Sequence, residues 1–196
     1  MEAGVPAGVV NFLCGKGSLI GKIVLDSPDF GGIHFTGSSA TFNSLWQKAG
    51  ENLTKYKTFP RMVGETGGKD YIFVHPSAVA DQVANAAFCG AFEFQGQKCS
   101  AASRMYAPKS LWPEILKGIK RRASEIKMGD VMDPDNFINA VIDETSFDNI
   151  KSYIDFAKKA KDAKVVVGGK CDKKVGYFVE IYGRGDIWTG ADCLCI

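Results

Sequence analysis

The α/β character of the chain is clearest in residues 32–64, GIHFTGSSATFNSLWQKAGENLTKYKTFPRMVG. This segment opens with a short apolar run, residues 32–36, that predicts a strand, and a turn of small residues, 37–39, follows it. A helix is expected from about residue 40 to residue 53, and a second strand over residues 59–64. Strand, helix and strand in this order are typical of a parallel sheet, so we predict an α/β fold.

The same alternation continues on both sides of this segment. Upstream, the sequence predicts a buried strand over residues 9–13 and a helix over residues 19–25. Downstream, it predicts strands over residues 70–74, 104–107, 164–167 and 177–180, and helices over residues 79–94, 111–126 and 146–160. Gly67 and Gly68 mark the boundary that we expect between two domains, because glycine lets the backbone change direction freely.

Composition and charge exclude several classes of function. The chain has 196 residues, with 24 basic and 22 acidic side chains and a net charge of +2. This balance does not favour binding to nucleic acid or to an anionic membrane surface. No apolar run approaches the roughly 18 to 20 residues that a membrane span needs. We therefore expect a soluble globular protein with neither a nucleic-acid nor a membrane partner.

The cysteines and histidines indicate neither a disulfide framework nor a metal site. Six cysteines are dispersed through a chain that is too large to need disulfides for stability, so we interpret them as reduced thiols. No CxxC or HxxxH spacing occurs, and there are only two histidines. The sequence therefore predicts no metal ligands.

Cys99 is the first candidate for chemistry. It follows an apolar helix through a turn and precedes Ser100 and two alanines. Small neighbours leave a thiol accessible, backbone N–H groups in such a turn can receive an oxyanion, and the adjacent Lys98 favours a thiolate. A structural thiol is the alternative interpretation, and a single cysteine in a turn does not exclude it.

Glu65 and the Gly37-Ser38 turn are the other two candidates. Glu65 follows a predicted strand and has glycines on either side, where a carboxylate could act as a general base through a water molecule. It could equally be a solvated loop residue. The turn leads from a strand into a helix N-terminus, which is a site for a pyrophosphate, although the full GxGxxG pattern is missing. The glycine could also serve only the turn.

The three candidates occur in one order: FTGS at 35–38, GETGGK at 64–69 and GQKC at 96–99. This combination resembles the aldehyde dehydrogenase superfamily. Its flanks, EAGVPAGVVNFL, FPRMVGETGGKD and FEFQGQKCSAASRMY, resemble the 1-pyrroline-5-carboxylate dehydrogenase family within it. The resemblance extends from Glu2 to Glu180. It implies an aldehyde dehydrogenase-like α/β fold, with the C-terminal half of a Rossmann-type cofactor domain followed by part of a catalytic domain.

The resemblance also implies the reaction and its residues. An NAD-dependent enzyme of this kind oxidises L-glutamate γ-semialdehyde to L-glutamate in proline degradation. Cys99 is then the nucleophile that forms a thiohemiacetal and a thioester, and Glu65 activates the hydrolytic water. The residues expected near the substrate are Ser100 and Ser103. Those expected near NAD are Gly37, Ser38, Ser39, Ala40, Thr41 and Gly67.

The resemblance also sets what we expect of the whole chain. It implies a partial dinucleotide-binding domain over residues 1–66 and a partial catalytic domain over 67–180. Residues 181–196 do not align with the family and form a divergent tail of unknown role. We therefore expect an incomplete chain with little activity of its own, from a homo-oligomeric parent in the mitochondrial matrix of a eukaryote or in the cytoplasm otherwise. The alternatives are a non-catalytic product that binds intact subunits and a dehydrogenase for another aldehyde.

Overall fold

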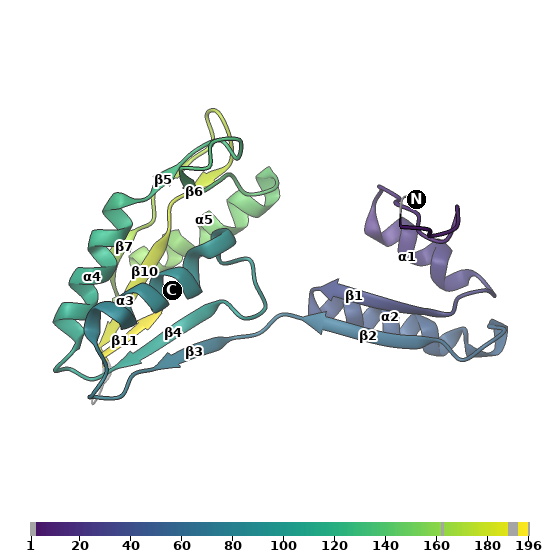
Figure 1. The fold of residues 1–196 in the computed structure, drawn as a ribbon, viewed down its shortest axis with the longest axis horizontal. Coiled ribbons are helices and arrows are strands. Elements are labelled where there is room, and N and C mark those ends of the chain that lie inside the picture. Colours follow the sequence, from purple (N-terminus) through teal and green to yellow (C-terminus); the bar gives the residue numbers. More distant parts are fainter. Residues whose placement is uncertain (1–2, 162, 188–191, 196) are drawn as a thin grey trace. The chain divides into compact units, whose positions relative to one another are not determined.

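The chain forms two compact units in a computed structural model that describes residues 3–161, 163–187 and 192–195. The first unit is Met1–Gly67 and the second is Gly68–Ile196. Figure 1 shows the elements of each unit, and the two are described separately below.

The first unit is built on two parallel strands. Its elements are α1 (Gly17–Asp26), β1 (Gly32–Gly37), α2 (Ser39–Glu51), the 3-10 turn η1 (Leu53–Lys55) and β2 (Arg61–Thr66). The strands pair in register from Gly32 with Arg61 to Gly37 with Thr66, and α2 lies along them (Figure 1). A small core of Leu25, Phe30 and Ala49 joins the helices to the sheet.

The predicted strand over residues 9–13 is wrong. These residues form irregular chain, and their apolar side chains are open to solvent, with Phe12 90% exposed. A strand is stable only when a neighbouring strand takes up its backbone hydrogen bonds. Within the part of the first unit that the structure describes, β1 and β2 pair only with each other. Residues 9–13 therefore have no neighbouring strand with which to pair among the described residues, despite their apolar pattern.

The second unit contains a five-stranded mixed sheet with three helices. Its elements are β3 (Asp70–Phe73), α3 (Ala80–Phe92), the 3-10 turn η2 (Glu93–Gly96), β4 (Ala102–Ala107), α4 (Trp112–Glu125), β5 (Lys127–Met128), β6 (Asn136–Ile138), α5 (Glu144–Lys159), β7 (Ala163–Gly168), β8 (Cys171–Asp172), β9 (Phe178–Val179), β10 (Tyr182–Ile187) and β11 (Asp192–Cys195). The strand order is β3-β4-β11-β10-β7. The β3–β4 pair is parallel and the other three pairs are antiparallel.

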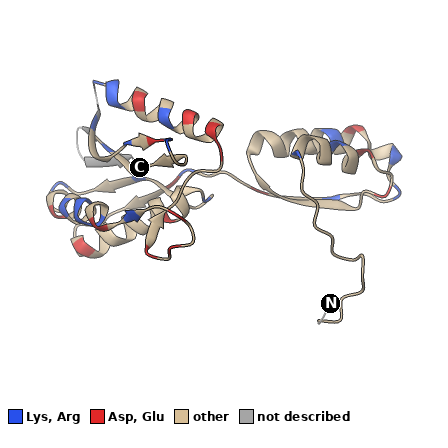
Figure 2. Cartoon of the chain, turned by 90° about the horizontal axis from the view of Figure 1, so that it is seen from above, with Lys and Arg blue, Asp and Glu red and all other residues tan. Residues whose placement is uncertain are grey.

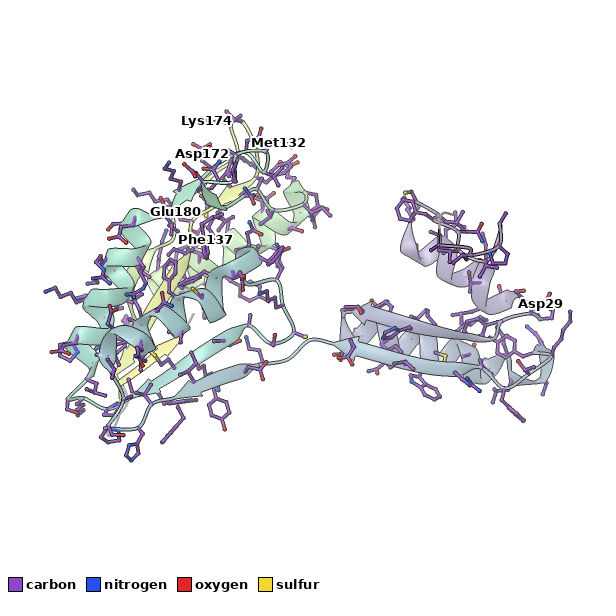
Figure 3. All side chains as sticks on the ribbon, viewed as in Figure 1. Asp29, Met132, Phe137, Asp172, Lys174 and Glu180 are labelled. Carbon is purple, nitrogen blue, oxygen red and sulfur yellow. The ribbon has the colours of Figure 1, made fainter. Side chains whose placement is uncertain are left out.

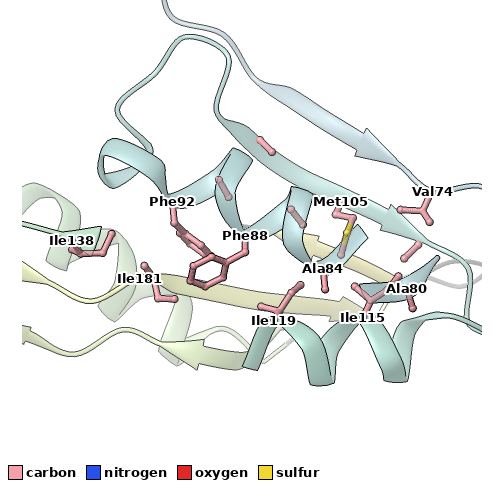
Figure 4. Packing of buried hydrophobic residues seen from close by; sticks show 14 residues of the cluster. Val74, Ala80, Ala84, Phe88, Phe92, Met105, Ile115, Ile119, Ile138 and Ile181 are labelled. Carbon is pink, nitrogen blue, oxygen red and sulfur yellow. The ribbon is translucent and has the colours of Figure 1, made fainter. Parts of the chain in front are cut away.

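The core of this unit lies where α3 and α4 pack on the sheet (Figure 4). Ile115 and Ile119 of α4 meet the alanine-rich face of α3, and Met105 of β4 lies under both helices. The helices approach closely at Gly118, where an added Cβ would lie 2.7 Å from the Cβ of Ala84. The second unit therefore has the larger buried apolar core of the two.

The predicted α/β fold is confirmed, and the predicted helices recur within a few residues of their expected bounds. Sequence pattern predicted no element beyond residue 180, whereas the structure has two strands there. The backbone of β11 pairs with β4 on one side and β10 on the other. The two strands beyond residue 180 are therefore part of the main sheet, where β11 and β10 together join β4 to β7.

Charged side chains of both signs are interspersed over each unit (Figure 2). Several form exposed pairs, such as Lys173 with Glu144 and Asp148, and contribute little to stability in water. No helix among the described residues is long and apolar enough to cross a membrane.

Candidate functional site

The start of α2 is a capped turn of the type that can bind an anion. Ser38 is its N-cap, and its Oγ accepts a hydrogen bond from the Thr41 N–H at 3.1 Å and lies 2.7 Å from Thr41 Oγ1. Because the first N–H groups of a helix have no partner within it, those of Ser39 and Ala40 are directed outward from the turn. At Gly37 an added Cβ would lie 2.7 Å from the Phe35 ring. The turn therefore depends on a residue without a side chain and has donors suited to a phosphate group.

Glu65 lies beside this turn, one residue before the end of β2. It pairs with Thr36 across the parallel strands, and the next pair is Gly37 with Thr66. Gly64 faces α2, because an added Cβ there would lie 2.3 Å from the Phe42 ring. Since side chains alternate along a strand, Glu65 projects from the opposite face of the sheet. Its carboxylate is exposed and can therefore reach a water molecule.

Cys99 is exposed in the loop between η2 and β4. Three consecutive residues before it have positive φ: Phe94 at 53°, Gln95 at 56° and Gly96 at 67°. We call residues 94–96 the left-handed turn. Left-handed backbone costs a residue with a side chain about 1–2 kcal/mol, so two such residues in succession are held by their surroundings. The strain lies just before the candidate nucleophile.

Two contacts hold this loop close to the rest of the unit. At Gly68, an added Cβ would lie 2.6 Å from the Cys99 carbonyl oxygen, so the chain entering β3 touches the backbone of the nucleophile. At Gly96, an added Cβ would lie 2.7 Å from the Ala91 carbonyl oxygen at the end of α3. Both positions require glycine because another backbone occupies the space of a side chain.

Lys98 is engaged by its neighbours and does not stand as an isolated charge beside the thiol. Its Nζ donates to Glu93 Oε2 at 2.5 Å and lies 5.2 Å from the centre of the Phe94 ring. The adjacent carboxylate offsets the field that Lys98 was expected to apply to Cys99. The ion pair instead spans the left-handed turn on its outer side.

The two serines after the nucleophile have different surroundings. Ser100 is exposed next to Cys99, whereas Ser103 is half-buried in β4. Ser103 lines a groove of about 700 Å³ that runs past Gly96 and Ala101 toward Ile154 of α5. The groove is largely apolar and borders the nucleophile loop. Ser103 therefore faces space that a small molecule could fill.

The other described thiols do not share this position. Cys14 is exposed in irregular chain, Cys89 is exposed in the last turn of α3, and Cys171 is half-buried on the β8–β9 hairpin. Burial raises the pKa of the Cys171 thiol and so disfavours its thiolate. Among the residues that the structure describes, no group of three or more metal-ligating side chains comes together.

The predicted site residues thus fall into two sets. The first unit brings Glu65 to the same sheet edge as Gly37, Ser38, Ser39, Ala40 and Thr41, with Gly67 just beyond β2. The second unit carries Cys99, Ser100 and Ser103 on one loop and the strand that follows it. Sequence reasoning did not single out Gln95 or Gly68. The glycine pair at 67 and 68 could have indicated a close backbone contact at Gly68. Neither Phe94 nor Gln95 is a residue type that predicts a left-handed backbone.

Comparison of the sequence with protein families identifies the class of protein to which this fold, this thiol and this turn belong. The model of the aldehyde dehydrogenase family matches residues 1–182. The chain belongs to the aldehyde dehydrogenase family. Residues 183–196, which include most of β10 and all of β11, lie beyond that match.

Individual relatives show which members of the family this chain is similar to. The chain is 50% identical over 182 residues to "Delta-1-pyrroline-5-carboxylate dehydrogenase, mitochondrial" of Dictyostelium discoideum, and 46% identical over 180 residues to the human protein of the same name. These matches cover 92% and 91% of this chain, and 33% and 32% of the two relatives. The chain therefore spans about a third of the length of the curated relatives it matches.

Solved structures agree with this relationship. Delta-pyrroline-5-carboxylate dehydrogenase from Mycobacterium tuberculosis, also solved bound with NAD, superposes with a TM-score of 0.86 at 43% identity. The match covers 92% of this chain and 34% of that one. An aldehyde dehydrogenase from Bacillus cereus, solved as an NAD+ complex, superposes with a TM-score of 0.84 at 28% identity.

Proposed function

We propose that this chain carries the nucleophile, the water-activating carboxylate and part of the NAD site of an enzyme that oxidises L-glutamate γ-semialdehyde to L-glutamate. The observation that carries the proposal is the position of Cys99, exposed after a strained turn in a chain that matches the family over residues 1–182. The curated relatives named for 1-pyrroline-5-carboxylate support the substrate, because glutamate γ-semialdehyde is the open form of that compound.

The residues at the start of α2 fit the cofactor. Outward N–H groups at the Ser38 turn, with Gly37 before them, suit the pyrophosphate of a dinucleotide. Gly67, at the end of the first unit, leaves the backbone open to close approach because nothing lies within 4 Å of its added Cβ. When bound, NAD supplies the acceptor for the hydride, and the protein supplies binding and orientation.

Cys99 and Glu65 divide the chemistry between them. The Cys99 thiolate attacks the aldehyde carbon and gives a thiohemiacetal, whose oxygen receives the Cys99 backbone N–H. After oxidation to the thioester, Glu65 takes a proton from water, and the hydroxide attacks the thioester carbon. The carbon–sulfur bond then breaks, which releases L-glutamate and the thiolate. Ser100 and Ser103 contact the substrate beside the thiol.

The activity is proposed for a polypeptide of the length that the relatives have. The stretch present here supplies two parallel strands of the cofactor unit, and we expect this chain alone to bind NAD poorly and to turn over little. By the same relationship the enzyme is a homo-oligomer, in the mitochondrial matrix of a eukaryotic source or in the cytoplasm otherwise.

Substitution of Glu65 tests the division of roles. In the full-length enzyme, Glu65→Gln should give one burst of NADH from glutamate γ-semialdehyde and then slow by roughly 10²–10⁴-fold, because the thioester no longer meets an activated water. Mass spectrometry should find the acyl group on Cys99. Cys99→Ala should give no burst, whereas Cys89→Ala removes another exposed thiol of the same unit and should match the wild type.

Two results would contradict the proposal. One is steady turnover by Cys99→Ala at the wild-type rate. The other is a preference of the full-length enzyme for simple aliphatic aldehydes over glutamate γ-semialdehyde, which would keep the chemistry but reject the substrate.

A further inference from the structure

The left-handed turn has one half-buried polar side chain, that of Gln95. With the amide oriented so that both of its polar atoms have partners, its oxygen accepts a hydrogen bond from the Asn139 N–H at 2.7 Å and its nitrogen donates to the Phe94 carbonyl oxygen at 3.0 Å. The Gln97 N–H donates to the same carbonyl oxygen at 3.1 Å. One amide thus closes the turn on itself and ties it to a distant segment of the chain.

That distant segment is anchored in the core. Asn139 follows β6, where Ile138 is only 2% exposed. Phe137 of β6 (Figure 3) contacts the Phe88 ring of α3, with ring centres 5.7 Å apart. The side chain of Asn139 donates to the Gly129 carbonyl oxygen at 3.1 Å. The Asn139 N–H that donates to Gln95 is therefore held in place by the core.

The other link across the turn is exposed. Lys98 and Glu93 form an ion pair in which the two side chains are 35% and 52% exposed. Water and salt screen such a pair, so it contributes little to holding the backbone. The Gln97 side-chain amide also donates to the Phe94 carbonyl oxygen, at 3.3 Å, but it is exposed and stays within the loop. The Gln95 amide, in contrast, reaches the anchored Asn139 backbone and so helps to offset the strain of the two left-handed residues.

We propose that Gln95 is a positioning residue for the Cys99 thiol: its amide joins the left-handed turn to the Asn139 backbone and so sets where Cys99 stands. The inference rests on the proposed role of Cys99 as nucleophile and adds the device that positions it. The backbone at Gly68 also lies against the Cys99 carbonyl oxygen and restricts the movement of the Cys99 backbone. Gln95 touches neither substrate nor cofactor in this role and acts through the loop.

Two reactions of Cys99 in the 196-residue chain separate position from nucleophilicity. With p-nitrophenyl acetate, the thiolate attacks the ester carbon, p-nitrophenolate leaves, and a thioester remains on Cys99. That reaction needs the thiol placed beside backbone N–H donors that receive the oxyanion. Alkylation by iodoacetamide needs only an accessible thiolate. Mass spectrometry of the Cys99 peptide measures both rates without NAD or the aldehyde.

Gln95→Met keeps the side-chain length and removes both hydrogen bonds. Acylation of Cys99 should slow by roughly tenfold to a hundredfold, because a displacement of about 1 Å is enough for a loss of that order. Alkylation should change by less than about threefold, since the thiol stays exposed. Gln82→Met, at an exposed position of α3, is the matched control and should leave both rates unchanged.

Gln95→Glu keeps an acceptor for the Asn139 N–H but replaces the donor to the Phe94 carbonyl oxygen with a carboxylate oxygen, so it should restore part of the acylation rate, after correction for any change in alkylation. This variant keeps the test decisive if Gln95→Met unfolds. Equal acylation by Gln95→Met and the wild type overturns the proposal. So does a Gln95→Glu protein as slow as Gln95→Met, or a wild type in which Cys99 is not acylated. Oxidation of the aldehyde is measured separately, so failure of the proposed function is told apart from failure of this role.

Discussion

Asn52 is the buried polar residue of the described core, only 2% exposed at the end of α2. Its Nδ2 donates to the Leu25 carbonyl oxygen at 2.9 Å and to Asp26 Oδ1 at 3.2 Å. It therefore satisfies the Leu25 carbonyl group near the end of α1 and fixes α1 against α2. The same hydrogen bond lowers the pKa of the Asp26 carboxyl below its ordinary value of 3.8, with a smaller opposing effect of burial.

Asn52→Ala should lower the free energy of unfolding of the first unit by about 1 kcal/mol, because it removes one buried donor to the Leu25 carbonyl oxygen and leaves the Tyr56 hydroxyl, at 2.7 Å, as the other donor. Urea titration followed by hydrogen exchange in α1 and α2 measures the loss. The pKa of Asp26 should rise toward 3.8, so the stability that its lowered pKa supplies above that pH should shrink. Gln47→Ala removes an exposed amide of α2 and should be nearly neutral. An equal effect of both substitutions would contradict the assigned role.

Helix α2 packs on the two strands through Phe42, whose ring fills the space that a side chain at Gly64 would need. The Phe42 ring lies against Gly64 of β2 and stacks on Phe35 of β1 with ring centres 5.8 Å apart. This contact sets the height of α2 above the strands and with it the position of the Ser38 turn. Gly64 also precedes Glu65, so one packing contact bears on the positions of both Glu65 and the Ser38 turn, the two candidate sites of the unit.

Gly64→Ala should lower the free energy of unfolding by about 1–3 kcal/mol, because the new Cβ overlaps the Phe42 ring and forces the helix to move. The NAD affinity of the full-length enzyme should fall as the turn shifts, which fluorescence titration measures. Gly50→Ala is the matched control: its Cβ meets nothing within 4 Å, and alanine should stabilise α2 by about 0.5–1 kcal/mol. Unchanged stability and NAD binding in Gly64→Ala would show that Phe42 does not seat the helix.

The two units differ in how much core each possesses. The fully buried apolar cluster of the second unit has members on α3, α4 and β4, whereas that of the first unit consists of Leu25, Phe30 and Ala49. Because stability follows buried apolar area, the first unit should open more readily than the second.

Hydrogen exchange should therefore show the amides of β1 and α2 exchanging before those of α3 and β4. Ile115→Ala, at a fully buried position of α4, should destabilise the second unit by about 2–5 kcal/mol and leave exchange in the first unit unchanged. Val131→Ala replaces an exposed apolar residue of the same unit and serves as its control. A single transition in which both units lose protection together would reject this difference.

Local pattern was enough for most of the fold, and it marked Cys99, Glu65 and the Gly37-Ser38 turn as candidates whose roles remain predictions. Apolar periodicity and glycine turns predicted the helices and most strands, because those signals act over a few neighbouring residues. The order of the FTGS, GETGGK and GQKC segments indicated the family, which the comparison over residues 1–182 confirms. Local pattern failed at residues 9–13, where an apolar run has no paired strand beside it among the described residues.

The sequence by itself determined which side chains are candidates for chemistry, since residue type and order single out Cys99, Glu65 and Ser38. Tertiary structure alone decided how the loop that carries Cys99 is held. Neither Phe94 nor Gln95 favours a left-handed backbone, and the Gln95 amide reaches Asn139, a partner far along the chain. It also decided that the last residues form β10 and β11 between β4 and β7. Strand pairing and strain relief depend on neighbours that only the folded chain brings together.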